Sequence, residues 1–254
     1  MENRLKATLE LLKELGFEEF YTPSEGRVFP QDEKNTGEPG RLEAENKPLK
    51  GASEEITPKG EEKREKVVLL EELYERNKNC CRCDLCKSRT QIVFYDGDPN
   101  SPVMFVGEAP GEEEDKRGKP FVGRAGQYLN KVLEEIGLPR ERIYITNVCK
   151  CRPPGNRKPR PKEMQACLNV FLRKELEIVQ PKVVCCLGGT AAEAFLGKTV
   201  RITRMRGRFY PNPLYPKAKL FLTYHPAYVL RNMWEAKTFK EDLKKLKEYL
   251  EKIT

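Results

Sequence analysis

A short cysteine-rich turn is the first part of this sequence that could do chemistry. Residues 80–86 read CCRCDLC, and the 254-residue chain holds nine cysteines. The polar N-terminus does not resemble a signal peptide, and in a reducing compartment thiols serve metal or cluster ligation before disulfides. Nine is also odd, so complete pairing is impossible. Four thiolates would suit a zinc ion or an iron–sulfur cluster equally well, whereas Cys185 and Cys186 fall in an apolar run and are expected in the core.

Four glycine-rich or polar turns form a second group of chemically capable residues. In chain order they are Gly107–Gly111, Asn147, Gly188–Thr190 and His225–Tyr228. Each follows an apolar run with the length and composition of a buried strand, namely Val103–Val106, Ile143–Thr146, Val183–Leu187 and Leu220–Thr223. Because ligands bind beyond the carboxyl ends of the strands in an open α/β sheet, the four turns predict one site at one sheet edge.

Helical segments alternate with these strands, near 62–78, 124–136, 161–178, 189–196 and 235–252. The alternation predicts a three-layer α/β/α fold with helices on both faces of a central four-stranded parallel sheet. Leucines at helical spacing before Gly16 predict a short amphipathic helix at 2–15, and residues 22–60 have the composition of a flexible, largely disordered linker. We therefore expect an N-terminal extension over 1–65 and a globular domain over 66–254.

The charge distribution is uneven along the chain. The net charge is +8, yet residues 1–70 hold 12 basic and 16 acidic side chains, which leaves 35 and 23 for residues 71–254. This asymmetry favours a polyanionic partner such as nucleic acid, although a solvated basic surface would look the same. No apolar run reaches the roughly 18 residues that span a bilayer, so we expect a cytoplasmic protein without a membrane segment. The abundance of Glu and Lys hints at a hot habitat.

The turns resemble, in order and spacing, the family 4 uracil-DNA glycosylases, the thermostable iron–sulfur group of the uracil glycosylase superfamily. The matching stretches are Gly107–Gly111 with Glu114-Asp115, Gly118–Gly126, Asn147–Pro154 with Asn156-Arg157, and His225–Tyr228. The similarity runs from about Lys66 to the C-terminus. It implies an enzyme that flips uracil out of DNA and hydrolyses the N-glycosidic bond, leaving an abasic site in base excision repair.

The resemblance also implies a [4Fe-4S] cluster with a structural role, zinc being the alternative. The matching ligands are Cys80, Cys83, Cys151 and Cys167. Cys81, Cys86 and Cys149 lie near them, and Cys83 with Cys86 would also form a ligand pair. Cys80 with Cys83 is preferred because Leu85 then falls where the family keeps a leucine.

The same resemblance assigns the uracil pocket to Glu108, Ala109, Pro110, Glu114, Phe121, Asn147 and His225. Phe121 is expected to stack on the flipped base. The Asn147 amide would accept from uracil N3–H and donate to O4, the reverse of the cytosine pattern. Glu114 would lie near uracil C5 and exclude the thymine methyl group. His225, the only histidine, would donate to uracil O2 as negative charge grows on the leaving base.

His225 and Glu108 are the candidate catalytic residues. Ala109 stands where the family 1 enzymes carry an aspartate, so we assign no general base. Glu108 is the nearest carboxylate and could bind uracil or orient water, or cleavage could be largely dissociative. Asp115 is expected to be a loop or helix-start carboxylate. The candidates for phosphate contact are Arg124, Arg152, Arg157, Arg160 and Arg231, and residues 228–231 could wedge into the space left by the flipped base.

Two other functions fit parts of this sequence. A family 5-like glycosylase would act on a broader set of deaminated bases, although Asn147 and the Glu108–Gly111 turn argue against it. A non-catalytic, metal-stabilised nucleic-acid-binding module would bind DNA and leave it intact. The sequence carries no signal for a preference among single-stranded, U:G and U:A DNA. We expect a monomer that acts on uracil-containing DNA and that could bind an unknown protein partner through residues 1–65.

Overall fold

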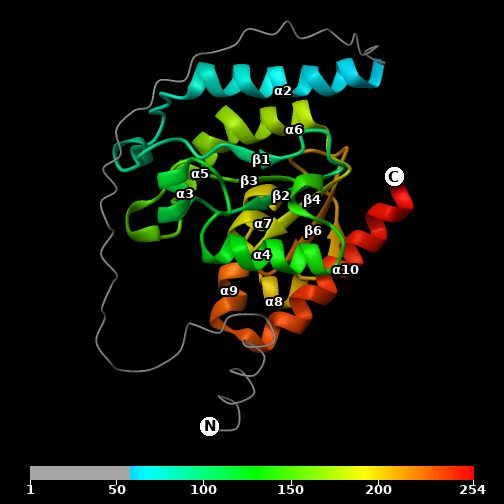
Figure 1. Ribbon diagram of the computed structural model, residues 1–254. Helices are drawn as coiled ribbons and strands as arrows, with labels where there is room; N and C mark the ends of the chain where they lie inside the picture. Colours follow the sequence, from blue (N-terminus) through cyan, green and yellow to red (C-terminus); the bar gives the residue numbers. More distant parts are fainter. Residues whose placement is uncertain (1–57) are drawn as a thin grey trace, which may run out of the picture. The chain divides into compact units, whose positions relative to one another are not determined.

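A six-stranded sheet forms the centre of the part of the chain that the structure describes (Figure 1). The computed structural model describes residues 58–254, with side chains from residue 64 onward. The strand order is β1-β3-β2-β4-β6-β5, and the four inner strands are parallel. Those four are β2 (Val103–Gly107), β3 (Tyr144–Asn147), β4 (Val183–Leu187) and β6 (Lys219–Thr223). They match the four predicted strands to within one residue at each end, and all their residues except Lys219 are buried.

The prediction of only four strands is wrong in one respect, because the sheet has two further strands at its edges. β1 (Tyr95–Gly97) pairs antiparallel with β3, and β5 (Arg208–Tyr210) pairs antiparallel with β6. Each is three residues long and none of its residues is fully buried. A segment this short is not long enough to display the alternation or the apolar run by which a strand is recognised. The α/β class is unaffected.

Helices cover both faces of the sheet, as the sequence predicts (Figure 1). One face of the strands packs against α2 (Pro58–Asn77), α6 (Arg173–Val179) and α7 (Gly189–Leu196), in a core that includes Met104, Val184 and Leu220. The other face is covered by α4 (Arg124–Glu135) and α10 (Ala236–Ile253), where the rings of Tyr128 and Phe239 stack at 6.0 Å. Successive strand residues point to opposite faces, so each strand supplies both cores. The three-layer arrangement is confirmed.

The long helix predicted at 161–178 is interrupted. It begins as α5 (Pro161–Cys167), continues as the π-helical turn η4 (Leu168–Leu172) and ends as α6. Such π turns often occur at functional sites, and this one begins directly after Cys167. α2 begins at Pro58, four residues before the predicted start. The short helices α3 (Glu112–Arg117), α8 (Ile202–Met205) and α9 (Pro226–Arg231) were not predicted, because four to six residues do not complete two helical turns.

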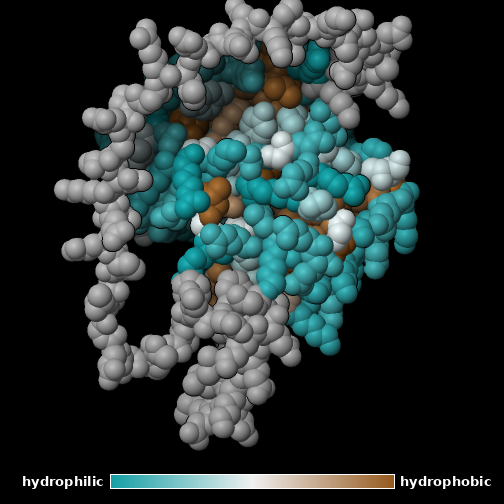
Figure 2. Space-filling model, viewed as in Figure 1, coloured by the Kyte–Doolittle hydropathy of each residue, from teal (hydrophilic) through white to brown (hydrophobic). Residues whose placement is uncertain are grey.

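The predicted helix at 2–15 and nearly all of the predicted linker at 22–60 lie outside the described residues. They stay predictions, as does a domain boundary at residue 65. Figure 2 shows hydrophilic side chains over most of the visible face of the described part, with hydrophobic side chains in small areas. None of the helices in residues 58–254 combines the length and the apolar character that crossing a membrane requires.

Candidate active site

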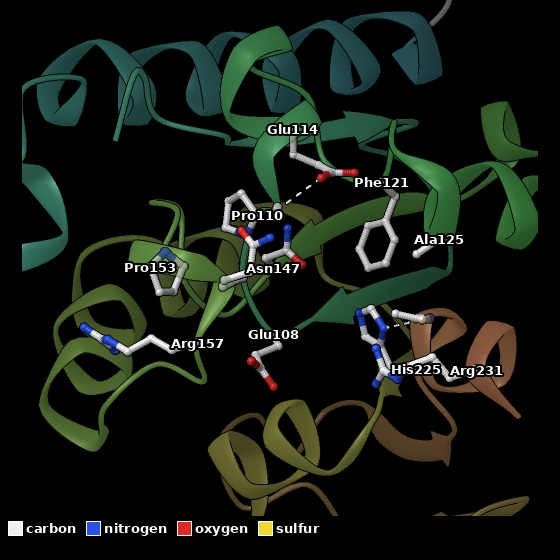
Figure 3. Close-up of a pocket in the computed structure, with 14 residues that line it drawn as sticks. Glu108, Pro110, Glu114, Phe121, Ala125, Asn147, Pro153, Arg157, His225 and Arg231 are labelled. Carbon is white, nitrogen blue, oxygen red and sulfur yellow. Dashed lines mark hydrogen bonds between the residues drawn. The ribbon is translucent and has the colours of Figure 1, made fainter. Parts of the chain in front are cut away.

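The turns that follow β2, β3 and β6 enclose a cavity of about 400 Å³ (Figure 3). All seven residues predicted to bind uracil line it: Glu108, Ala109, Pro110, Glu114, Phe121, Asn147 and His225. The structure therefore confirms that these turns, far apart in the sequence, converge on one space. Which ligand atom each side chain meets stays a proposal.

Glu114 fastens two walls of the cavity together. It lies in the first turn of α3, and its Oε2 accepts a hydrogen bond from the Gly111 N–H at 3.1 Å. Its Oε1 accepts from the N–H groups of Val122 and Gly123 at 2.9 and 2.7 Å. One carboxylate therefore joins the turn after β2 to the loop 118–123. Charge-assisted bonds of this kind are stronger than neutral ones, so this side chain is fixed as well as near the cavity.

Phe121 reaches the cavity from that loop and is 4% exposed. Its φ of +54° lies in the left-handed region, which costs a non-glycine residue about 1–2 kcal/mol. Arg140 compensates by donating to the carbonyls of Phe121 and Pro120 at 3.2 and 2.6 Å, while its Nε donates to Asp96 at 2.8 Å. Gly126 in α4 completes the support, because the Phe121 carbonyl occupies the space in which any other residue would carry its Cβ.

Asn147 is the last residue of β3 and is 2% exposed. It pairs with Gly107 of β2, and a Cβ on Gly107 would stand closer than 3.0 Å to the Asn147 Oδ1 and to the Phe121 ring. Only glycine therefore lets the amide and the ring approach the strand end. The Asn147 carbonyl accepts a hydrogen bond from the Lys150 Nζ at 2.9 Å.

His225 sits at the N-terminus of α9, and its Nδ1 accepts a hydrogen bond from the Ala227 N–H at 3.1 Å (Figure 3). An imidazole that accepts at Nδ1 carries its single proton on Nε2. Burial, helped by the positive charge of Arg231, lowers the pKa of His225 to about 4. The residue is therefore a neutral hydrogen-bond donor near pH 7. Its ring lies 5.8 Å from the Phe121 ring, with 31° between the planes.

The predicted turn Gly188–Thr190 does not line the cavity, contrary to the expectation of four turns around one site. Gly188 has a φ of +91°, and a Cβ there would lie 3.0 Å from the Cβ of His225. The turn therefore supports His225 from behind, while β4 contributes no residue to the cavity.

Two of the predicted phosphate-contact arginines, Arg157 and Arg231, line the cavity, whereas Arg124, Arg152 and Arg160 do not. Arg157 forms a bidentate pair with Glu163, at 2.8 and 2.7 Å. Arg152 pairs with Glu112 at 3.3 Å. A phosphate at either of these two side chains would share the guanidinium with a carboxylate.

The segment 228–231, predicted as a wedge, is partly buried. Val229 has no exposed surface, which excludes it from insertion into DNA. Tyr228 packs on Tyr224 with 4.9 Å between ring centroids. Leu230 is half-buried and Arg231 is exposed, so both remain accessible for such a role.

Five cavity residues were not predicted: Gly111, Ala125, Pro153, Asn156 and Ala227. All five lie inside the motif stretches that carry the family resemblance. Their place in those stretches could have identified them, whereas the chemistry of their side chains could not. Lys150 was also missed. Its side chain is fully buried behind Asn147. A lysine in a loop between two motif residues would be expected to face solvent instead.

The four predicted cysteine ligands are neighbours in the structure. Cys83 and Cys167 are hydrogen-bonded, which raises the pKa of the Cys83 thiol. Burial raises the pKa of Cys151, and the nearby Cys83 and Cys80 add to the rise. Arg89 links the two pairs by donating to the Cys80 carbonyl at 2.6 Å and to the Cys151 Sγ at 3.2 Å. The arrangement joins the segment before β1 to the loop after β3.

A disulfide joins Cys81 and Cys86, a pairing that the sequence analysis did not predict. It removes Cys86 from the alternative ligand pair with Cys83. Cys149 is buried and hydrogen-bonded to Cys167, so it is an additional thiol beside the four. In the described part of the chain, no three His, Cys, Asp or Glu side chains are arranged closely enough to hold a metal ion by themselves.

Asp115 has the structural place that the sequence suggested. It is 3% exposed, and both of its carboxylate oxygens accept from the Thr90 N–H at 3.0 Å. Asp115 does not line the cavity. Its hydrogen bonds to Thr90 anchor the segment before β1 to α3.

Comparison with known proteins identifies the family. A model of the uracil DNA glycosylase superfamily matches residues 94–251, which include every turn around the cavity. The chain belongs to the uracil-DNA glycosylase superfamily. The family expected from the motifs is confirmed, and with it the expected enzyme class, a DNA N-glycosylase.

The similarity to type-4 uracil-DNA glycosylases covers nearly the whole length of those relatives. The type-4 enzyme of Thermotoga maritima is 46% identical over 187 residues, which are 72% of this chain and 96% of the relative. That of Archaeoglobus fulgidus is 40% identical over 184 residues, 70% and 92% of the two chains. A type-5 uracil-DNA glycosylase of Pyrobaculum aerophilum matches less well, at 34% over 146 residues, 52% and 63%. This uracil-DNA glycosylase therefore resembles type 4 more closely than type 5.

Proposed function

We propose that this chain flips uracil out of DNA and hydrolyses its N-glycosidic bond, and that the base binds in the cavity described above. The observation that carries the proposal is the convergence of Phe121, Asn147 and His225 on one cavity of about 400 Å³. A base must leave the stack before side chains can reach its glycosidic bond, and a shaped pocket offsets the few kcal/mol that this costs. A cavity at the surface that offers an aromatic ring, an amide and a histidine suits that task.

Recognition of uracil is assigned to Phe121 and Asn147. Arg140 fixes the left-handed backbone of Phe121, and with it the position of the ring, which can stack on the base. The Asn147 amide can pair with uracil N3–H and O4, and the opposite pattern on cytosine would leave buried polar groups without partners. Glu114 cannot turn away from the cavity without losing three hydrogen bonds, which supports a role as a fixed wall beside uracil C5.

Bond cleavage is assigned to His225 as a neutral donor. As the C1′–N1 bond breaks, its electron pair moves onto the base, and the Nε2–H of His225 can stabilise the charge that grows on uracil O2. Water then adds to C1′, and the proton that it loses neutralises the uracil anion. Glu108 also lines the cavity and is assigned to orient that water or to bind the base.

A [4Fe-4S] cluster on Cys80, Cys83, Cys151 and Cys167 is part of the proposal. The fit rests on the contacts among these thiols and on the Arg89 bridge between the two pairs. When bound, the cluster supplies four iron–thiolate bonds and no step of the hydrolysis. The loop that carries Cys151 also carries Pro153, Asn156 and Arg157, so these thiolates would fix one wall of the cavity.

Uracil-containing DNA is the expected partner, with phosphates contacted by Arg157 and Arg231 at the cavity and by Arg124, Arg152 and Arg160 farther away. A monomeric state, a cytoplasmic location and a protein partner for residues 1–65 stay predictions. The Cys81–Cys86 disulfide bears on the redox state of the isolated chain. Titration of free thiols in protein purified without reductant measures whether that bond persists.

The decisive experiment compares uracil excision by the wild type, His225→Ala and Asn147→Asp, with iron measured on the same samples. His225→Ala should reduce the rate about 10²- to 10³-fold. Asn147→Asp should lose uracil excision and gain activity on cytosine. Equal wild-type activity on hypoxanthine would assign the broader type 5 specificity, and binding without cleavage would assign a nucleic-acid-binding module.

A further inference from the structure

Lys150 has an unusual environment for a lysine in a loop. Its side chain has no exposed surface. The Nζ donates to the Asn147 carbonyl at 2.9 Å and to the Thr146 hydroxyl, and it pairs with the Glu175 carboxylate at 2.5 Å. An ammonium group has three protons, and three acceptors surround this one. Burying such a charge costs several kcal/mol, so the site must compensate for it with good geometry.

Glu175 provides the counterion from a different element. It lies in α6 and is also fully buried. Its Oε1 accepts a hydrogen bond from the Tyr144 hydroxyl at 2.8 Å. Its Oε2 has no hydrogen-bond partner and forms only the ion pair with the Lys150 Nζ. The helix that follows Cys167 is thereby tied to the end of β3. Neither Lys150 nor Glu175 lines the cavity, so neither can touch a bound base.

The contact with Asn147 gives this ion pair a consequence for the cavity. From behind, Lys150 holds the Thr146 hydroxyl and the Asn147 carbonyl, which belong to the last two residues of β3. From the front, the Val148 N–H donates to the Gly107 carbonyl at 2.9 Å and the Cys149 N–H donates to the Glu108 carbonyl at 3.0 Å. The Asn147 backbone is therefore fixed on two sides. The direction of its Cα–Cβ bond, and hence of its amide, follows from that backbone.

We propose that Lys150 is a positioning residue for uracil recognition, and that Glu175 is the counterion that keeps its ammonium group in place behind Asn147. The inference rests on the proposed role of Asn147 as the group that reads uracil. Replacing a buried ion pair by neutral residues is often harmless to stability, so stability alone gives no reason for the pair to be charged. Orientation of the Asn147 peptide gives such a reason, because the charged Lys150 donates to its carbonyl.

The test uses Lys150→Met, Glu175→Gln, the double variant, and Asn147→Ala as a reference. Tm, the single-turnover excision rate on a uracil oligonucleotide, and inhibition by free uracil are measured for each. Lys150→Met should lose stability because Glu175 is left as an unpaired buried charge. The double variant should recover Tm yet remain about 10- to 100-fold slower and less sensitive to uracil, since misplacing a binding group by about 1 Å can cost 100-fold. Glu175→Gln leaves Lys150 as an unpaired buried charge, so it should lose Tm. It should slow excision by less than the double variant, because the Lys150 side chain and its contact with the Asn147 carbonyl remain.

Lys182→Met is the control, because the exposed Lys182 also donates to a backbone carbonyl, at 2.6 Å, but that carbonyl belongs to Ile253 at the end of α10 and not to a cavity residue. It should excise uracil at the wild-type rate. A double variant with wild-type rate and uracil inhibition would overturn the inference if Asn147→Ala is impaired. Rates that merely follow Tm across the three variants would overturn it as well. Wild-type behaviour of Asn147→Ala would instead remove the proposed recognition role itself, and this inference with it.

Discussion

The ring of Phe121 occupies the space in which Gly107 would carry a side chain, so the last residue of β2 is limited to glycine by an aromatic ring 14 positions later. We expect Gly107→Ala to displace Phe121, Asn147 or both. Excision should fall about 100-fold, because small misplacements of binding groups have effects of this size. Stability should fall by about 1–3 kcal/mol, as for other overpacked positions. Single-turnover rates and urea unfolding measure the two effects.

Gly189→Ala is the control for that substitution. A Cβ on Gly189 would meet only the Val200 carbonyl, at the ordinary distance of 3.6 Å. Because alanine also favours a helix over glycine, this variant should be as stable as the wild type or slightly more so. Equal losses in Gly107→Ala and Gly189→Ala would show that the crowding at Gly107 is unimportant.

His225 should remain neutral through the pH range in which a histidine ordinarily titrates. Its pKa is lowered to about 4, against about 6.5 in an unfolded chain. NMR of the imidazole should therefore show no titration between pH 5.5 and 8, and the excision rate should have no inflection near 6.5 from this group. Arg231→Gln should raise the pKa, since it removes one of the two causes of the shift. A measured value near 6.5 in the wild type would contradict the neutral-donor assignment.

The lowered pKa of His225 also makes the free energy of unfolding depend on pH between 6.5 and about 4. Between pH 6.5 and 4 the unfolded chain binds a proton that the folded imidazole does not. The contribution of His225 to the free energy of unfolding is therefore complete above pH 6.5 and is lost as the pH falls toward 4. Unfolding of His225→Gln, measured over this range, should be less sensitive to acid than that of the wild type.

Glu114→Gln should loosen the junction between the two cavity walls. The amide keeps one acceptor oxygen, so at least one of the three backbone N–H groups loses its partner, at a cost of about 1–3 kcal/mol. Excision should fall and discrimination against thymine should weaken, which competition between uracil and thymine oligonucleotides would detect. Glu113→Gln is the matched control on the same helix: its side chain is 47% exposed and forms surface ion pairs, so it should change stability by less than about 0.5 kcal/mol.

The proposed ligand set predicts which cysteines retain iron. Cys167→Ser should abolish iron binding, whereas Cys81→Ser/Cys86→Ser should retain it, because those two sulfurs are bonded to each other. Iron and zinc content per chain, measured with thermal unfolding, checks both. Loss of metal in the double variant would instead favour Cys86 as a ligand, and zinc without iron in all samples would favour the alternative metal.

The inner strands could be predicted because burial leaves a local signal. A strand such as Val183–Leu187 is covered on both faces and reads as a continuous apolar run. The polar residues at the strand ends could be predicted for the same reason, since each interrupts such a run. The edge strand Arg208–Tyr210 has partners on one side only and carries no pattern of its own.

Other parts of the site depend on contacts that no short stretch of sequence encodes. The left-handed backbone of Phe121 is held by Arg140, 19 residues away, and nothing in the loop sequence indicates it. The burial of Lys150 depends on Glu175, which reaches it from another helix. Chemical type predicts that a lysine faces water, and only the three-dimensional arrangement reverses that expectation.

The antiparallel strands at the two borders of the sheet limit what can be added to it. Each is three residues long, so a border offers few unpaired N–H and C=O groups to another chain. An incoming strand would find too little backbone to extend the sheet, and growth into strand-to-strand assemblies is disfavoured. Strand addition at these borders is therefore a poor way for this fold to bind another chain.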